Sequence, residues 1–124
     1  MRRFFFAVAA AVAMFVGTAC GSGYGSSSPS APSNAPPPAG AITVNVVREN
    51  GSQSFSPNPA TIPAGQMVVW HNVDTTTHQV VLDDGTLDTG NLPPGAFSQP
   101  MMLAAPGPYH CSIHPDMVGT VVNQ

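Results

Sequence analysis

Apolar and polar positions alternate in short runs through the last two thirds of the chain, and many apolar members are β-branched. Alternation with a period of two predicts half-buried β-strands. These runs cover residues 41–47, 66–72, 78–82, 97–103 and 119–123, and a proline-punctuated edge strand is expected within 55–65. No run keeps the 3.6-residue period of a helix, and the chain's 14 prolines further disfavour helices. The pattern predicts an all-β fold, an antiparallel β-sandwich with Trp70 in its core.

Residues 1–19 follow a different pattern, a positive start followed by a short apolar run. Arg2 and Arg3 precede the apolar run Phe4 to Val16, and small residues at positions 17 and 19 complete a cleavage site after Ala19. This layout predicts a secretory signal peptide. The 13-residue run would span about 20 Å as a helix, less than the ~30 Å of a bilayer core, which disfavours a transmembrane anchor. We therefore expect export, to the periplasm or the cell surface.

Cleavage after Ala19 would make Cys20 the first mature residue, as in the lipobox of bacterial lipoproteins. Ordinary secretion with a bare Cys20 thiol is the alternative, because Gly17 stands where that motif usually has Leu. A disulfide between Cys20 and Cys111 is less favoured, since Cys111 has better-spaced partners. Residues 20–40 are mostly Gly, Ser, Pro, Ala and Asn and are expected to form a disordered tether. The folded domain is expected at 41–124, tied to a membrane only through the lipid on Cys20.

Removal of the signal peptide's two arginines takes the formal charge from −3 to −5. Arg48 is then the only strong base, and the chain has no lysine. Without a basic patch to meet phosphates, nucleic-acid binding is disfavoured. A weakly acidic surface suits a basic partner.

The chemistry of the chain is concentrated near its C-terminus. Cys111, His114 and Met117 follow one another with the spacing C-x2-H-x2-M, so a thiol, an imidazole and a thioether could point inward from one tight loop. A thiolate, two imidazoles and a weak axial thioether are the ligands of an electron-transfer copper site, and His78 could supply the second imidazole. A structural zinc site is the alternative, but such sites are richer in thiolate and seldom use thioether. The donor set therefore favours one copper ion.

The domain resembles the cupredoxins, the small blue-copper proteins that include plastocyanin, pseudoazurin and amicyanin. The resemblance covers essentially all of residues 41–124 and is carried in order by Phe55-Ser56-Pro57 with Ala64-Gly65, by Val69 to Asp74, by His78, and by Pro106 to Gly119. The short ligand loop is most similar to that of amicyanin. The resemblance implies a Greek-key sandwich in which His78, Cys111, His114 and Met117 bind the copper.

The family also implies that electrons leave through the ring edge of His114, within an apolar surface patch. Pro93, Pro94 and Pro115 are the expected members of this patch, with Met102 as a further possibility.

Three residues stand apart from this pattern. Several cupredoxins have Asn after their first histidine ligand, where this chain has Gln79, so the support that this side chain gives the ligand loops is an open question. His110 adjoins Cys111 on a strand, so its side chain should face away from the metal. His71 is expected at a surface or sheet edge rather than among the ligands.

These features lead to a functional hypothesis of a monomeric, exported electron carrier with one copper ion cycling between Cu(I) and Cu(II). Its partner would be another redox protein, a cytochrome or a copper or haem enzyme. The alternative is a copper-binding or copper-delivery protein that uses the same four ligands but transfers the ion. A metal-free structural domain is a third reading. An enzyme is not expected, because the sequence offers neither an open coordination position nor substrate-binding groups.

Overall fold

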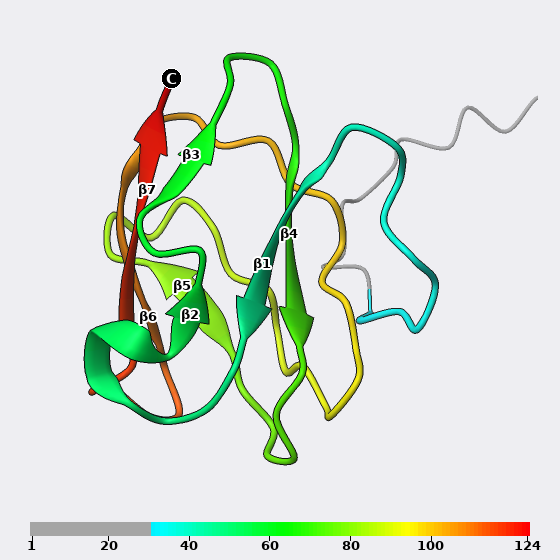
Figure 1. Ribbon diagram of the computed structural model, residues 1–124, viewed down its shortest axis with the longest axis vertical. Helices are drawn as coiled ribbons and strands as arrows, with labels where there is room; N and C mark the ends of the chain where they lie inside the picture. The colour runs from blue at the N-terminus through cyan, green and yellow to red at the C-terminus, as the bar shows by residue number, and fades with distance from the viewer. Residues whose placement is uncertain (1–30) are drawn as a thin grey trace, which may run out of the picture.

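The computed structural model describes residues 31–124, which contain seven β-strands in two sheets joined by long loops (Figure 1). The strands are β1 (Ile42–Val46), β2 (Phe55–Ser56), β3 (Ala60–Ile62), β4 (Val68–Asn72), β5 (Val80–Leu82), β6 (Gly107–Cys111) and β7 (Val118–Asn123). Within those residues the one helical element is a 3-10 turn, η1 (Gly51–Gln53). The predicted all-β class is therefore confirmed.

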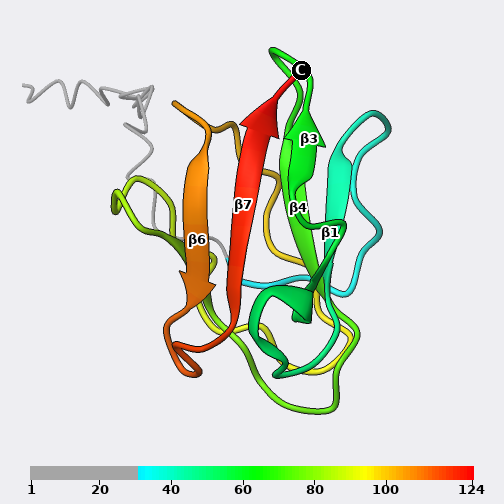
Figure 2. The same ribbon diagram turned by 60° about the vertical axis from the view of Figure 1, so that its left-hand side comes forward.

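The two sheets are mixed rather than purely antiparallel. One sheet has the order β2-β1-β4 and the other the order β3-β7-β6-β5. The pairs β1·β4 and β3·β7 run parallel, and the other pairs run antiparallel (Figure 2 shows β6 and β7 side by side). The parallel pairs arise because the chain leaves the first sheet after β2 and joins the second at β3. Pro57 and Pro59 lie at this crossing, where they have no N–H to donate to either ladder.

A single apolar core lies between the sheets, with Trp70, as predicted, among its buried members. Trp70 and Phe55 from the first sheet meet the ring of Tyr109 from the second, both edge-on, with ring centroids 5.7 Å and 4.8 Å away. Burial raises the pKa of the Tyr109 hydroxyl. The Tyr109 ring lies directly over Gly119, its partner in the β6–β7 register, where a Cβ atom would overlap it. The absence of a side chain at Gly119 therefore lets the Tyr109 ring lie across β7, next to the loop that joins β6 and β7.

The strand predicted at 97–103 does not form. Phe97 and Met101 each make an isolated bridge to β4, opposite His71 and Val68. Pro100 stands between them without an N–H. At Ser98 the hydroxyl, rather than a backbone carbonyl, accepts a hydrogen bond from the backbone N–H of Trp70 (2.9 Å). A proline and a side-chain bond thus interrupt the ladder, which explains why alternation alone was misleading here.

The predicted signal peptide and the lipobox at Cys20 lie outside the described residues, as does the first half of the predicted tether. Residues 31–40 are described, and they contact the domain. The backbone of Ser33 exchanges two hydrogen bonds with that of Phe97, and Ala31 accepts one from the Gln99 side chain. Ordered contacts therefore begin before the predicted boundary at Ala41. In the described part of the chain, no helix combines the length and the apolar character needed to cross a membrane.

Candidate metal centre

Three side chains from the predicted ligand set, those of His78, Cys111 and His114, converge beside the loop between β6 and β7. This loop lies at the lower end of the sandwich in Figure 1. The Cys111 sulfur lies 3.7 Å from Nδ1 of His78 and 3.7 Å from Nδ1 of His114, and the two Nδ1 atoms are 3.3 Å apart. A point equidistant from these three atoms lies about 2.1 Å from each, within the range of metal–imidazole and metal–thiolate bonds. The triangle thus has the size that a single transition-metal ion requires.

Strands and their ends hold the three donors in place. Cys111 is the last residue of β6, and its sulfur is buried. His78 lies at the entrance to β5, where its backbone exchanges two hydrogen bonds with that of Leu92. His114 comes from the loop between β6 and β7 and is only partly buried. His78 thus lies where a loop enters the sheet, two residues before β5 begins.

Met117 closes the loop that carries His114. Its backbone N–H donates to the carbonyl of His114 (3.0 Å), and its own carbonyl accepts from the N–H of Cys111 (3.0 Å). The Met117 side chain is fully buried in the same core cluster as Cys111. The short C-x2-H-x2-M loop is thus a tight turn with both ends tied by backbone bonds, which leaves its side chains little freedom.

Asp74 supports His78 from behind, a role that the sequence did not reveal. Its Oδ2 lies 2.8 Å from Nε2 of His78. An ionised carboxylate only accepts, so this contact favours the tautomer in which Nε2 carries the proton and Nδ1 presents a lone pair to the cluster. The hydrogen bond from His78 lowers the pKa of the Asp74 carboxyl, and the Thr75 N–H adds to this effect. An ionised Asp74 thus fixes both the orientation and the tautomer of the ring.

Asn72 is the second supporting residue that the sequence left unassigned. Its buried amide donates to the carbonyls of Thr76 (2.7 Å) and Leu92 (2.8 Å), and its oxygen accepts from the N–H of Asp74 (2.9 Å). These bonds tie the 73–77 loop to the end of β4 and to the segment that pairs with His78. An Asn at a strand end before a polar loop is too common a pattern to signal this role by itself.

The open question at Gln79 is resolved by its main chain. The Gln79 side chain donates to the exposed carboxylate of Asp88 (2.8 Å and 3.0 Å), away from the ligand loops. Its backbone N–H points at the Cys111 sulfur (3.5 Å), and its carbonyl accepts from the N–H of Ser112 (2.8 Å). The strand backbone, rather than an amide side chain, therefore links the two ligand segments at this position.

The other two histidines of the chain lie outside the cluster, as predicted. His110 faces the opposite side of β6, and its Nδ1 lies 2.6 Å from an exposed oxygen of Asp83. His71 stacks on the ring of Phe97, with centroids 3.9 Å apart and planes 6° from parallel. Both rings have local partners that explain them without a metal.

Known structures with the same arrangement were found by comparison of the fold. Two amicyanin mutants in the Cu(I) form match with TM-scores of 0.62 and 0.60 at 24% and 26% identity, each over 79% of this chain and 95% of theirs. A purple cupredoxin from Nitrosopumilus maritimus matches with a TM-score of 0.57 at 23% identity, over 67% of this chain and 99% of its own. No protein-family model and no curated protein sequence matches the chain.

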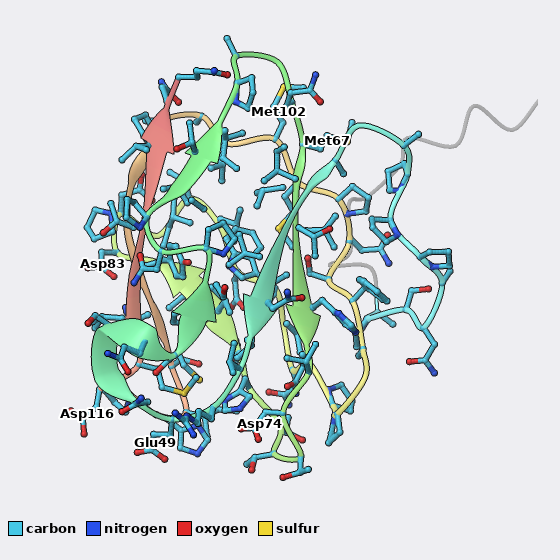
Figure 3. The ribbon with its side chains drawn as sticks, viewed as in Figure 1. Glu49, Met67, Asp74, Asp83, Met102 and Asp116 are labelled. Carbon is cyan, nitrogen blue, oxygen red and sulfur yellow. The ribbon has the colours of Figure 1, made fainter. Side chains whose placement is uncertain are left out.

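The chain has the cupredoxin fold. The resemblance inferred from the motifs and the expected Greek-key sandwich are confirmed. Among the described residues, four of the six exposed large apolar side chains lie at strand ends or in the loop beside the cluster: Val47, Val73, Ile113 and Val118. Pro93, Pro94 and Pro115 are also exposed near it. Met102 lies at the opposite end of the molecule, so its tentative place in the apolar patch was wrong (Figure 3).

The residues at the centre of this cupredoxin fold fit a copper ion. The Nδ1 atoms of His78 and His114 lie 3.3 Å apart beside the buried Cys111 sulfur, and two lone pairs at that separation would repel each other unless a proton or a cation lay between them. One thiolate with two imidazoles is the in-plane donor set of blue-copper sites, and it is poorer in thiolate than structural zinc sites.

Proposed function

We propose that this protein is an electron carrier that holds one copper ion through His78, Cys111, His114 and Met117. The observation that carries the proposal is the convergence of two imidazole nitrogens and a cysteine sulfur on a point about 2.1 Å from each. Met117 would be the fourth ligand, because it is buried in the same core cluster as Cys111 and lies in the same loop as His114. The amicyanin structures that match include Cu(I) forms and oxidised forms.

Bound copper would supply a one-electron couple, and the protein would keep the geometry of the site constant between its two states. Asn72 and Asp74 hold His78, and the strand backbone at Gln79 holds Cys111. Burial of His78, Cys111 and Met117 keeps water away from the ligands. A rigid, water-free site minimises rearrangement when the charge changes, which favours rapid electron exchange over release of the ion.

Electrons would enter and leave through His114, the ligand that is only partly buried. The apolar side chains around it include Ile113 at 45% exposure and Val73 at 49%. Such a surface can exclude water against a redox partner and bring it close to the His114 ring. The partner proposed is a cytochrome or a copper or haem enzyme. Its surface should be basic, because the mature chain has six acidic side chains and only one arginine.

Export and tethering belong to the same proposal and rest on the sequence of residues 1–40. The signal peptide would deliver the chain outside the cytoplasm as a monomer. Lipidation of Cys20 would then attach it to a bacterial membrane. Mass spectrometry of the protein purified from membranes tests this directly, because a diacylglyceryl group adds a large, defined mass to the peptide that begins at Cys20.

The copper site is tested by adding Cu(II) to the purified full chain and recording visible and EPR spectra. We expect an intense thiolate-to-copper band that is lost in Cys111→Ser. His110→Gln is the matched control, since His110 adjoins Cys111 but pairs with Asp83 on the outer face, and the band should persist. Absence of the band in the parent protein, or its survival in Cys111→Ser, would contradict the proposal.

The electron carrier and the copper-delivery protein differ in which species moves. A carrier retains its ion against a chelator and exchanges electrons quickly with a cytochrome, whereas a delivery protein does the reverse. The hydrogen bonds that hold His78 and the two ends of the ligand loop favour retention, and hence the carrier. Measurement of the copper off-rate alongside the electron self-exchange rate separates the two.

A further inference from the structure

Two exposed methionines, Met67 and Met102, lie at the end of the sandwich opposite the metal cluster (Figure 3). Val68 and Met101 exchange both of their backbone hydrogen bonds, each 2.9 Å long, in an antiparallel bridge. Extended by one residue, the register of this isolated bridge sets Met67 opposite Met102. Residues opposite one another in a non-hydrogen-bonded pair have Cβ atoms about 4.5–5.5 Å apart on the same face. In that register the two thioethers would lie within reach of one another.

Burial along the two segments confirms which way these side chains point. Val68 is fully buried, and Met101 and Leu103 pack against the core. Met67 and Met102 occupy the alternate positions and are 41% and 63% exposed. They are the only two of the six exposed large apolar side chains of the described residues that lie away from the cluster end (Figure 3). The pair thus points outward into solvent.

No charged side chain lines the two hollows beside this methionine pair. Met67 borders a hollow of about 230 Å³ and Met102 a second of about 210 Å³, and Gln66 borders both. All of the residues that line the two hollows are uncharged. The labelled carboxylates Asp74 and Asp116 lie at the far end of the molecule in Figure 3. The side chains that line the two hollows offer a hard divalent ion no carboxylate, so the thioethers favour a soft ion here.

We propose that Met67 and Met102 form a second metal site, selective for soft monovalent ions such as Cu(I) and Ag(I). Thioether sulfur is a soft donor that prefers Cu(I), and two neutral sulfurs can approach one ion without a charged ligand. With two protein donors the ion keeps an open position toward solvent, which suits a site that takes up and passes on its ion. The proposal does not depend on copper binding by Cys111.

The test uses Ag(I) as the probe, with the copper-loaded full chain carrying ¹³C-labelled methionine methyl groups. We expect the methyl signals of Met67 and Met102 to shift together and to saturate at one equivalent of Ag(I). Replacement of either residue by Leu should weaken Ag(I) binding at the other by about tenfold or more. Met101→Leu is the matched control, because Met101 points inward from the same segment. Zn(II) should shift neither signal.

Independent saturation of the two methyl signals, or an unchanged shift of Met102 in Met67→Leu, would overturn the proposal. Met67→Leu and Met102→Leu each test the proposal, so if one variant fails to fold, the other still gives an answer. Each methyl group gives its own signal, so Ag(I) bound at Cys111 would shift the signal of Met117 and not those of Met67 and Met102. Failure of the copper centre would therefore not be mistaken for failure of the methionine pair.

Discussion

Asp74 should set the reduction potential of the copper centre, and Asp74→Asn tests this. The carboxylate lies 2.8 Å from the outer nitrogen of His78, and its side chain is 18% exposed. A negative charge near the metal stabilises the more positive Cu(II) state. The amide keeps a hydrogen-bond acceptor for His78 but removes the charge, so the potential of the variant should rise.

The size of the rise follows from the distance. The hydrogen bond, the width of the imidazole and one metal–nitrogen bond place the carboxylate about 7 Å from the metal. At an effective dielectric constant of ~20, one unit charge at that distance contributes about 2.4 kcal/mol, or about 100 mV for a one-electron couple. Solvent reaches part of this carboxylate and weakens the interaction. We therefore expect an increase of about 50–100 mV.

The assay is voltammetry of the parent and variant proteins at neutral pH, with the visible band recorded to verify an intact site. Asp84→Asn is the matched control, because Asp84 lies past the far end of β5, more than a Debye length of about 8 Å away in physiological salt. Its potential should stay within about 20 mV of the parent's. An unchanged or lower potential in Asp74→Asn, with the band intact, would refute the electrostatic reasoning.

Three further substitutions test the support of the site. Gly119→Ala places a Cβ in the ring of Tyr109 and should lower the free energy of unfolding by about 1–3 kcal/mol or more; unchanged denaturant unfolding would contradict this packing. Asn72→Ala leaves the carbonyls of Thr76 and Leu92 without their hydrogen-bond donor. The free energy of unfolding should fall by about 1–3 kcal/mol, and a chelator should remove copper faster. Gln79→Ala removes only the exposed bond to Asp88, so stability should change by less than about 0.5 kcal/mol, and a large shift in potential would be unexpected.

The donors of the metal cluster could be predicted from the sequence because their chemistry and spacing are local. Cys111, His114 and Met117 lie within one loop, and soft donors of this kind are rare enough to stand out. His78 could be added because the proposed site lacked one imidazole. The supporting residues could not be found in this way. Asn72 and Asp74 look like any polar residues around a turn, and only the fold brings them to His78.

The strands could be predicted where alternation coincides with a continuous ladder. At 97–103 the alternation is real, since Met101 and Leu103 do face the core. Pro100 and the Ser98 hydroxyl nevertheless break the backbone pairing, and hydrophobic patterning contains no information about that. The parallel pairing of β1 with β4 was hidden for a related reason, because it joins segments separated by strands of both sheets.

The rigidity of the metal centre depends on both sheets, although its histidine and cysteine ligands come from only one. His78 and Cys111 adjoin the paired strands β5 and β6, whereas Asn72 ends β4 in the opposite sheet. Asn72 holds the crossing loop 73–77, and with it Asp74 and the rear of His78. The distance between the sheets at this point is set by Trp70, two residues before Asn72, against Tyr109, two residues before Cys111. A cavity at Trp70 would therefore weaken the hydrogen bonds that hold His78 in place, although Trp70 is not one of the proposed ligands. Such a substitution should lower both the stability of the fold and the rate of electron exchange.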